Sequence, residues 1–129
     1  MDFCRVFNNG KLERDFTYID DIVSGVLAAN RRTPLPDASG VRHAIYNLGN
    51  NRSEPLLRYI ELIEQALGRK AEMKFEPLQK GDVVATYADI EASRRDLGFA
   101  PSTPIETGIP RFIEWYKAYH AELEAVPAT

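Results

Sequence analysis

Apolar residues along the chain form short runs separated by segments in which they recur at helical spacing. Short extended runs are expected at residues 5–8, 15–19 and 72–75, and the turn dipeptide Asn9-Gly10 ends the first of them. The continuous apolar run at 44–48 is typical of a strand that is buried on both faces. Because strands and helices alternate, the pattern predicts an α/β or α+β fold with a few short strands. Such a sheet would be incomplete, so we expect the chain to be part of something larger.

Four helices are expected, and their ends carry recognisable signals. A polar or acidic side chain that could cap the first turn precedes each helix, and a glycine that could close the last turn follows two of them. The expected caps are Asp20 or Asp21, Ser53, Asp89 and Thr103, and the closing glycines are Gly68 and Gly98. Pro110 interrupts the last helical pattern, so that helix is expected either to restart or to kink there.

Length and composition indicate one ordinary globular unit spanning residues 1–129. The chain is 44% hydrophobic and 27% charged, close to the average for globular domains. Its net charge of −3 argues against nucleic acid as the main partner. No apolar run approaches the roughly 20 residues that span a bilayer, so no membrane association is expected. The single cysteine suits a reducing, cytoplasmic environment.

Two short segments could bind an anion. Arg14 carries a forked set of donors that suits phosphate oxygens, and Lys11 with the backbone amides around Gly10 could complete a pocket. The simpler interpretation, favoured by spacing alone, is a solvated arginine paired with Glu13 or Asp15. The loop Gln79-Lys80-Gly81-Asp82 could also approach a ligand closely, although an ordinary turn is the simpler interpretation from the residues alone.

Other chemistries lack the residues they need. The histidines and the cysteine are not at metal-ligand spacing, and no serine lies in a Gly-x-Ser-x-Gly elbow, so neither a metal site nor a serine nucleophile is expected. The aromatic cluster near the end of the chain is interpreted as helix packing rather than as a stacking platform. Its members are Phe112, Trp115, Tyr116 and Tyr119.

The order of several motifs resembles the C-terminal portion of the extended short-chain dehydrogenase/reductases, the NAD-dependent epimerases and dehydratases. Within that superfamily the chain resembles the nucleotide-sugar epimerases of the UDP-glucuronate 4-epimerase type. The motifs are Arg14-Asp15-Phe16-Thr17-Tyr18-Ile19-Asp20-Asp21-Ile22-Val23, Tyr46-Asn47-Leu48-Gly49-Asn50, Gly81-Asp82-Val83, Thr86-Tyr87-Ala88-Asp89, Leu97-Gly98-Phe99 and Pro101-Ser102-Thr103-Pro104-Ile105-Glu106. The resemblance covers nearly the whole chain.

The resemblance implies a role in binding a UDP-sugar, UDP-glucuronate or UDP-galacturonate. In the family, a Rossmann domain holds NAD and a smaller C-terminal domain holds the sugar nucleotide. Arg14 matches an arginine that contacts the diphosphate, and Phe7 and Asn8 lie in a segment that passes near the nucleotide. Gln79, Lys80 and Asp82 match a second phosphate-contacting loop, in which related UDP-galactose epimerases carry arginine at the position of Gln79. The run at 44–48 resembles a strand that returns to the Rossmann sheet.

The family's catalytic parts are not found in this sequence. No tyrosine is followed four residues later by lysine, and no glycine-rich phosphate loop is present. We therefore expect no catalytic residue and no bound NAD in this chain alone, although the full-length family uses NAD. Three interpretations remain: the substrate-binding portion of an epimerase, whose partner is the missing Rossmann half; a stand-alone module that binds a nucleotide sugar or pairs with a full-length relative; and a degenerate interaction domain.

Overall fold

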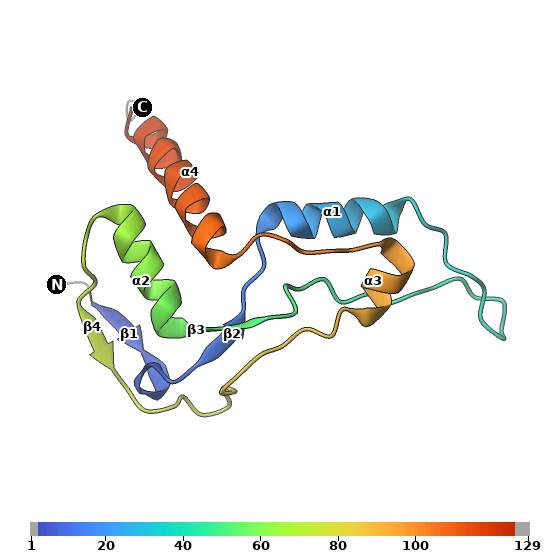
Figure 1. The fold of residues 1–129 in the computed structure, drawn as a ribbon, viewed down its shortest axis with the longest axis horizontal. Coiled ribbons are helices and arrows are strands. Elements are labelled where there is room, and N and C mark those ends of the chain that lie inside the picture. Colours follow the sequence, from blue (N-terminus) through green and yellow to red (C-terminus); the bar gives the residue numbers. More distant parts are fainter. Residues whose placement is uncertain (1–2, 126–129) are drawn as a thin grey trace. The chain divides into compact units, whose positions relative to one another are not determined.

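The computed structural model describes residues 3–125 and shows an α/β fold with four helices and a few short strands (Figure 1). These residues form two compact units, each assembled from separate stretches of the chain. The first unit comprises Met1–Leu12, Pro55–Val84 and Pro104–Thr129, and the second comprises Glu13–Glu54 and Ala85–Thr103. Since the two units alternate along the sequence, the expectation that residues 1–129 act as a single unit stays a prediction. No helix in the described part is both long and apolar enough to cross a membrane.

The first unit packs two helices against a small parallel sheet. Strand β1 (Cys4–Val6) pairs with β4 (Met73–Phe75), with Val6 opposite Phe75. Helices α2 (Leu56–Leu67) and α4 (Ile105–Ala125) lie side by side (Figure 1). The buried apolar side chains of this unit are Val6, Leu12, Leu62, Ile105, Ile109 and Ile113. Residues 72–75 were expected as a strand, and β4 confirms that prediction.

The prediction for the C-terminal end of α2 is confirmed, and the prediction for its N-terminal end is wrong. Gly68 closes the helix in a left-handed conformation, with φ of 69°, as its sequence position indicated. Ser53 does not cap the helix, because it lies in β3 (Ser53–Pro55) and the helix begins three residues later. The Ser53 hydroxyl instead donates to the carbonyl of Thr86 at 2.7 Å. Ser53 precedes an apolar helical stripe, but it lies in a paired strand and does not cap the helix.

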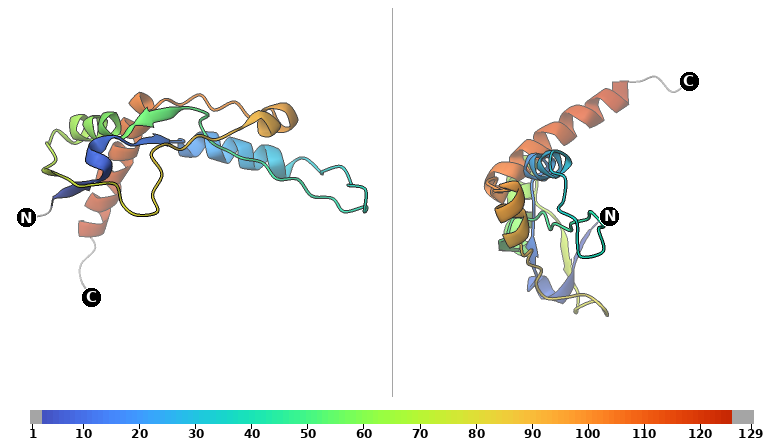
Figure 2. Two further views of the ribbon diagram at one scale, coloured as in Figure 1. Left: turned by 90° about the horizontal axis from the view of Figure 1, so that it is seen from below. Right: turned by 90° about the vertical axis from the view of Figure 1, so that its right-hand side faces the viewer.

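Helix α4 runs without a break through Pro110 (Figure 2). The helix therefore does not restart at Pro110, although proline in its second turn removes one backbone donor. Among residues 105–121, whose burial the structure describes, Ile113 is the last buried side chain of the helix.

The second unit joins two helices and a second short pair of strands. Strand β2 (Glu13–Asp15) pairs with β3, helix α1 spans Ile19–Asn30, and α3 spans Glu91–Leu97. Helix α1 meets its neighbours through Gly25, where an added Cβ would lie 2.7 Å from Leu48 and 2.9 Å from Phe99. Gly98 closes α3 with φ of 66°, as predicted. The N-cap of α3 is Ile90 and not the expected Asp89, although Asp89 Oδ1 accepts the amide of Glu91 at 3.0 Å just before the helix.

Neither aspartate at the start of α1 acts as its N-cap, which corrects the prediction from sequence. The cap is Tyr18, and Asp20 and Asp21 lie within the first turn. The buried carboxylate of Asp21 instead accepts the amides of Ser102 and Thr103, at 3.3 and 3.0 Å. The aspartate therefore joins two segments that are distant in sequence, and it still lies where a negative charge favours the helix dipole.

The expected buried strand at 44–48 does not form in the structure. The segment has no assigned strand, and Ile45 is 86% exposed. The apolar side of α1 is also open, because Ile19, Val23, Val26 and Leu27 are each 45–61% exposed. An apolar run needs neighbouring strands to become a sheet, and the second unit supplies none at this segment.

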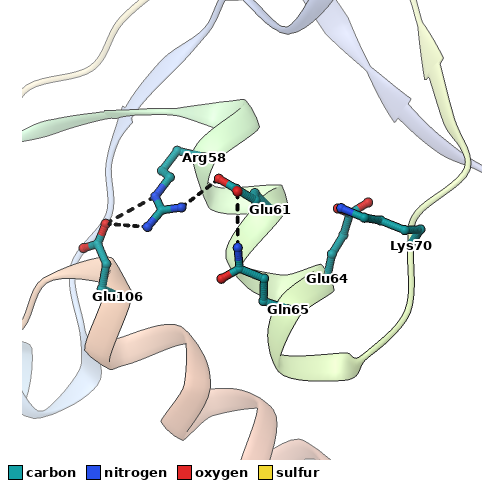
Figure 3. A network of polar contacts seen from close by, with 6 residues as sticks. All are labelled: Arg58, Glu61, Glu64, Gln65, Lys70 and Glu106. Atoms are coloured by element: carbon teal, nitrogen blue, oxygen red, sulfur yellow. Dashed lines mark hydrogen bonds and ion pairs between the residues drawn. The ribbon is translucent and has the colours of Figure 1, made fainter.

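A polar network connects α2 with α4 and with the turn after α2 (Figure 3). Arg58 bonds Glu61 at 2.7 Å within α2 and Glu106 of α4 at 3.4 Å. Beyond the helix end, Glu64 accepts from Lys70 at 2.6 Å and from the amide of Ala71 at 2.8 Å. The Lys70 hydrogen bond, and next the Ala71 amide, hold the pKa of Glu64 below its ordinary value.

We expect Glu64→Gln to destabilise the first unit at neutral pH but not in acid. Because the folded-state pKa of Glu64 is lowered, its ionised form adds stability above the unfolded-state pKa, and this is lost as pH falls through the folded-state pKa. Urea unfolding followed by Trp115 fluorescence at several pH values measures the difference. Glu72→Gln, at an exposed glutamate of the same unit, is the control, and an equal loss of stability in both variants would contradict the assignment.

Candidate functional site

A left-handed turn places Phe7 and Asn8 at the end of β1. Asn8 and Asn9 both have φ near 50°, a conformation that asparagine tolerates better than most residues. Gly10 follows with φ of 78°, and an added Cβ there would lie 2.8 Å from Leu57. The Asn8 side chain donates to the carbonyl of Lys11 at 2.7 Å, which fixes the turn from within. The turn predicted at Asn9-Gly10 is confirmed, and its left-handed conformation begins one residue earlier, at Asn8.

The Phe7 ring lies against the guanidinium of Arg5, which pairs with a carboxylate at the end of the neighbouring strand. Arg5 donates to both carboxylate oxygens of Glu76, at 3.0 and 2.6 Å, and its guanidinium lies 4.9 Å from the centre of the Phe7 ring. The hydrogen bond to Glu76 raises the pKa of Arg5, and the same contact lowers the pKa of Glu76. Phe7 therefore sits beneath a fixed cation rather than on a mobile loop.

The loop that carries Gln79, Lys80 and Asp82 follows directly after β4. The amide of Asp82 donates to the carbonyl of Gln79 at 3.1 Å, and Gly81 takes a φ of 88°. Asp82 Oδ1 accepts the amide of Val83 at 2.8 Å, whereas Gln79 and Lys80 are exposed. The loop is thus a defined turn with two long polar side chains outside it.

Pairing of β1 with β4 brings the turn and the loop into one unit. The amide of Glu76 donates to Val6 at 2.9 Å, and the amide of Asn9 donates to Glu76 at 3.0 Å. The left-handed turn therefore lies beside the residues from which the loop departs. Of the six predicted site residues, Phe7, Asn8, Gln79, Lys80 and Asp82 belong to this first unit, and Arg14 belongs to the second.

Arg14 lies in β2, where it is half-buried. Its Nη1 donates to the carbonyl of Glu13 at 2.8 Å. This bond ties the guanidinium to its own strand, which limits the directions in which its remaining donors can point.

Asp15, next to Arg14, holds three backbone amides, and sequence reasoning missed this role. Its two carboxylate oxygens accept the amides of Asn50, Asn51 and Ala88 at 2.9, 3.0 and 2.9 Å. We call this arrangement the Asp15 clamp. Gly49 lies against it, since an added Cβ would be 2.3 Å from the Cβ of Ala88. The one available signal was that Asp15, Gly49 and Ala88 each lie in one of three separate sequence motifs.

The described residues contain no group of three or more histidine, cysteine, aspartate or glutamate side chains that could hold a metal ion. The local chemistry is a half-buried guanidinium beside a clamped carboxylate in one unit, and a left-handed turn with a polar loop in the other. Cationic and amide donors of this kind suit the oxygens of an anionic ligand.

No family model matches the chain, but it has clear relatives among known proteins. It is 45% identical to an uncharacterized protein of Methanocaldococcus jannaschii, over 86% of this chain and 32% of that protein. It is 38% identical to UDP-glucuronate 4-epimerase 5 of Arabidopsis thaliana, over 88% of this chain and 28% of the plant protein.

A solved structure gives the same picture. The crystal structure of UDP-glucuronic acid 4-epimerase from Bacillus cereus, in complex with UDP-glucuronic acid and NAD, matches with a TM-score of 0.75 and 25% identity. The match covers 92% of this chain and 36% of the bacterial enzyme. The chain thus spans about a third of the length of the proteins it matches.

Proposed function

Since the chain is homologous to the C-terminal part of UDP-glucuronate 4-epimerases, we propose that it is the UDP-sugar-binding portion of such an epimerase. The observation that carries the proposal is the 38% identity to a plant UDP-glucuronate 4-epimerase over 88% of this chain. The ligand would be UDP-glucuronate or UDP-galacturonate, the substrate pair implied by that relationship.

Arg14 is the residue that we propose for the diphosphate. A guanidinium offers several donors in a fixed plane, which matches phosphate oxygens. The Asp15 clamp supports this role, because it anchors the backbone immediately after Arg14 to segments 50–51 and 88. Within the first unit, Phe7, Asn8, Gln79, Lys80 and Asp82 are proposed to contact the nucleotide and phosphate groups of a UDP-sugar.

The chain's own helix starts do not suit the pyrophosphate of NAD. A glycine-rich turn before a helix normally lets the phosphates approach the free amides. In the described residues the turns before the helices contain no such glycines, and acidic side chains occupy the first turns of α1, α3 and α4. Hydride transfer to and from NAD would therefore need residues outside this sequence.

The missing Rossmann half is the proposed partner of the second unit. The apolar segment 44–48 forms no strand within the described residues, and the apolar side of α1 is exposed. Apolar surface of this extent is unusual on an isolated domain. A sheet supplied by the rest of a longer enzyme would satisfy both features, which supports the proposal over that of a degenerate interaction domain.

We expect Arg14→Ala to weaken UDP-glucuronate binding by about tenfold to a hundredfold, the loss of one charge-assisted contact to phosphate. Amide NMR spectra of the chain, titrated with UDP-glucuronate and separately with NAD, measure this. Resonances near Arg14 and residues 79–82 should shift with the sugar nucleotide and not with NAD.

Arg69→Ala is the matched control, because Arg69 is an exposed arginine of the first unit outside the proposed site. Equal affinity of the Arg14 and Arg69 variants would remove Arg14 from the site. A well-dispersed spectrum that does not respond to UDP-glucuronate at millimolar concentration would count against an autonomous binding module.

A further inference from the structure

Thr86 bonds to the backbone on both sides of Arg14. The Thr86 amide donates to the carbonyl of Glu13 at 3.2 Å, and the Thr86 hydroxyl accepts the amide of Asp15 at 3.0 Å. The Glu13 carbonyl belongs to the peptide bond before Arg14, and the Asp15 amide belongs to the peptide bond after it. Since all four residues lie in the second unit, Thr86 holds both peptide groups that flank Arg14 within one compact body.

Thr86 is itself held in place by hydrogen bonds. The hydroxyl of Ser53, in β3, donates to the carbonyl of Thr86 at 2.7 Å. The preceding residue, Ala85, forms an isolated bridge with Glu13. The amide, the hydroxyl and the carbonyl of this half-buried threonine are therefore all engaged, so the residue can serve as a fixed support for β2.

The same hydrogen bonds extend to the guanidinium of Arg14. The carbonyl oxygen of Glu13 accepts from the Thr86 amide at 3.2 Å and from Arg14 Nη1 at 2.8 Å. A carbonyl oxygen has two lone pairs, so it can accept both donors at once. The direction of the Glu13 carbonyl therefore determines where Arg14 Nη1 is held, and Thr86 fixes that direction.

We propose that Thr86 is a positioning residue for Arg14 and, through it, for the diphosphate of the UDP-sugar. The effect on the ligand rests on the function proposed above for Arg14, whereas the effect on the guanidinium does not. A guanidinium makes its strongest contact with phosphate when two parallel N–H groups point at the oxygens together, which requires its plane to be held. The Thr86 hydroxyl is the part of this support that a side-chain replacement removes, because the amide and the carbonyl remain in every variant.

Thr86→Val tests the positioning role, because valine keeps the size and branching of the side chain and lacks the hydroxyl. Rotation about the Nε–Cζ bond of Arg14 requires its hydrogen bond to the Glu13 carbonyl to break. Measured by NMR exchange at the guanidinium nitrogens, this rotation should be about threefold or more faster in Thr86→Val, as expected for the loss of one neutral hydrogen bond. Thr86→Ser keeps the hydroxyl and should restore the wild-type rate. Thr33→Val, at an exposed threonine of the same unit, is the matched control and should leave the rate unchanged.

Affinity for UDP-glucuronate tests the consequence for the ligand. Thr86→Val should weaken binding by about threefold to tenfold, and Thr86→Ser should bind like the wild type. In the Arg14→Ala background, Thr86→Val should have no further effect, because a residue that acts through Arg14 then has nothing to position. Equal weakening by Thr86→Val in both backgrounds would show that Thr86 does not act through Arg14, and it would overturn the proposal.

The two measurements separate this proposal from the proposed function. An Arg14 guanidinium that rotates equally fast in Thr86→Val and in the wild type would overturn the positioning role, whether or not the sugar nucleotide binds. Faster rotation in Thr86→Val together with no binding of UDP-glucuronate by the wild type would support the positioning role and count against the proposed function alone. If Thr86→Val does not fold, unhindered rotation of Arg14 in the wild type would overturn the proposal, and slow rotation that Thr86→Ser preserves would support it.

Discussion

Replacing Asp15 with alanine is expected to lower the free energy of unfolding of the second unit by about 3 kcal/mol. The carboxylate accepts three amides, from Asn50, Asn51 and Ala88, at 2.9–3.0 Å. Alanine would leave these donors without their acceptor in a partly buried place. Asp15→Asn should lose less, because its one carbonyl oxygen can still accept from one side of the clamp.

Native-state hydrogen exchange measures this effect where it arises. Exchange of the amides of Asn50, Asn51 and Ala88 should accelerate in Asp15→Ala, while the α2 amides of the first unit change little. Asp20→Ala is the control, an exposed aspartate of the same unit that should cost about 0.5 kcal/mol through the helix dipole. If Asp15→Ala and Asp20→Ala lower the free energy of unfolding by similar amounts, the Asp15 clamp contributes little to stability.

The second large effect is expected from a single added methyl group at Gly49. A Cβ there would lie 2.3 Å from the Cβ of Ala88 and 3.2 Å from Asp15 Oδ2. Relief would require the backbone to move apart at the point where the Asp15 clamp holds it together. We therefore expect Gly49→Ala to destabilise the second unit by about 3 kcal/mol through overpacking.

The double variant Gly49→Ala with Ala88→Gly tests the cause directly. Moving the methyl group from one backbone to the other restores the space between them, so most of the lost stability should return. Thermal unfolding of the two single variants and the double variant supplies the complete cycle. If the double variant is as unstable as the sum of the single ones, steric overlap with Ala88 is not the reason.

Elements whose ends depend on local backbone geometry were predictable from the sequence. Gly68 and Gly98 end their helices in left-handed conformations, and β4 forms where the pattern placed it. These features depend on the few residues around them, and only glycine adopts such a conformation without strain.

Features that depend on distant partners were not predictable. Asp21 and Ser53 were read as caps because they precede apolar helical stripes, yet both bond to segments far away in sequence. The residues next to Asp15 did not indicate that its carboxylate would accept the backbone amides of residues 50, 51 and 88. The run at 44–48 has the composition of a buried strand, but composition cannot provide the neighbouring strands. The residues of the candidate site were proposed from the sequence, and the structure shows how their backbones are held.

The interleaving of the two units has a consequence for synthesis of the chain on the ribosome. Five alternating segments compose the units, and the last segment of the first unit starts only at Pro104. Helix α2 must therefore wait for α4, about forty residues later, before its apolar side is covered. Contacts of such long sequence separation slow folding and leave apolar surface exposed in the meantime. The apolar side of α2 therefore stays exposed on the nascent chain until α4 has been synthesised.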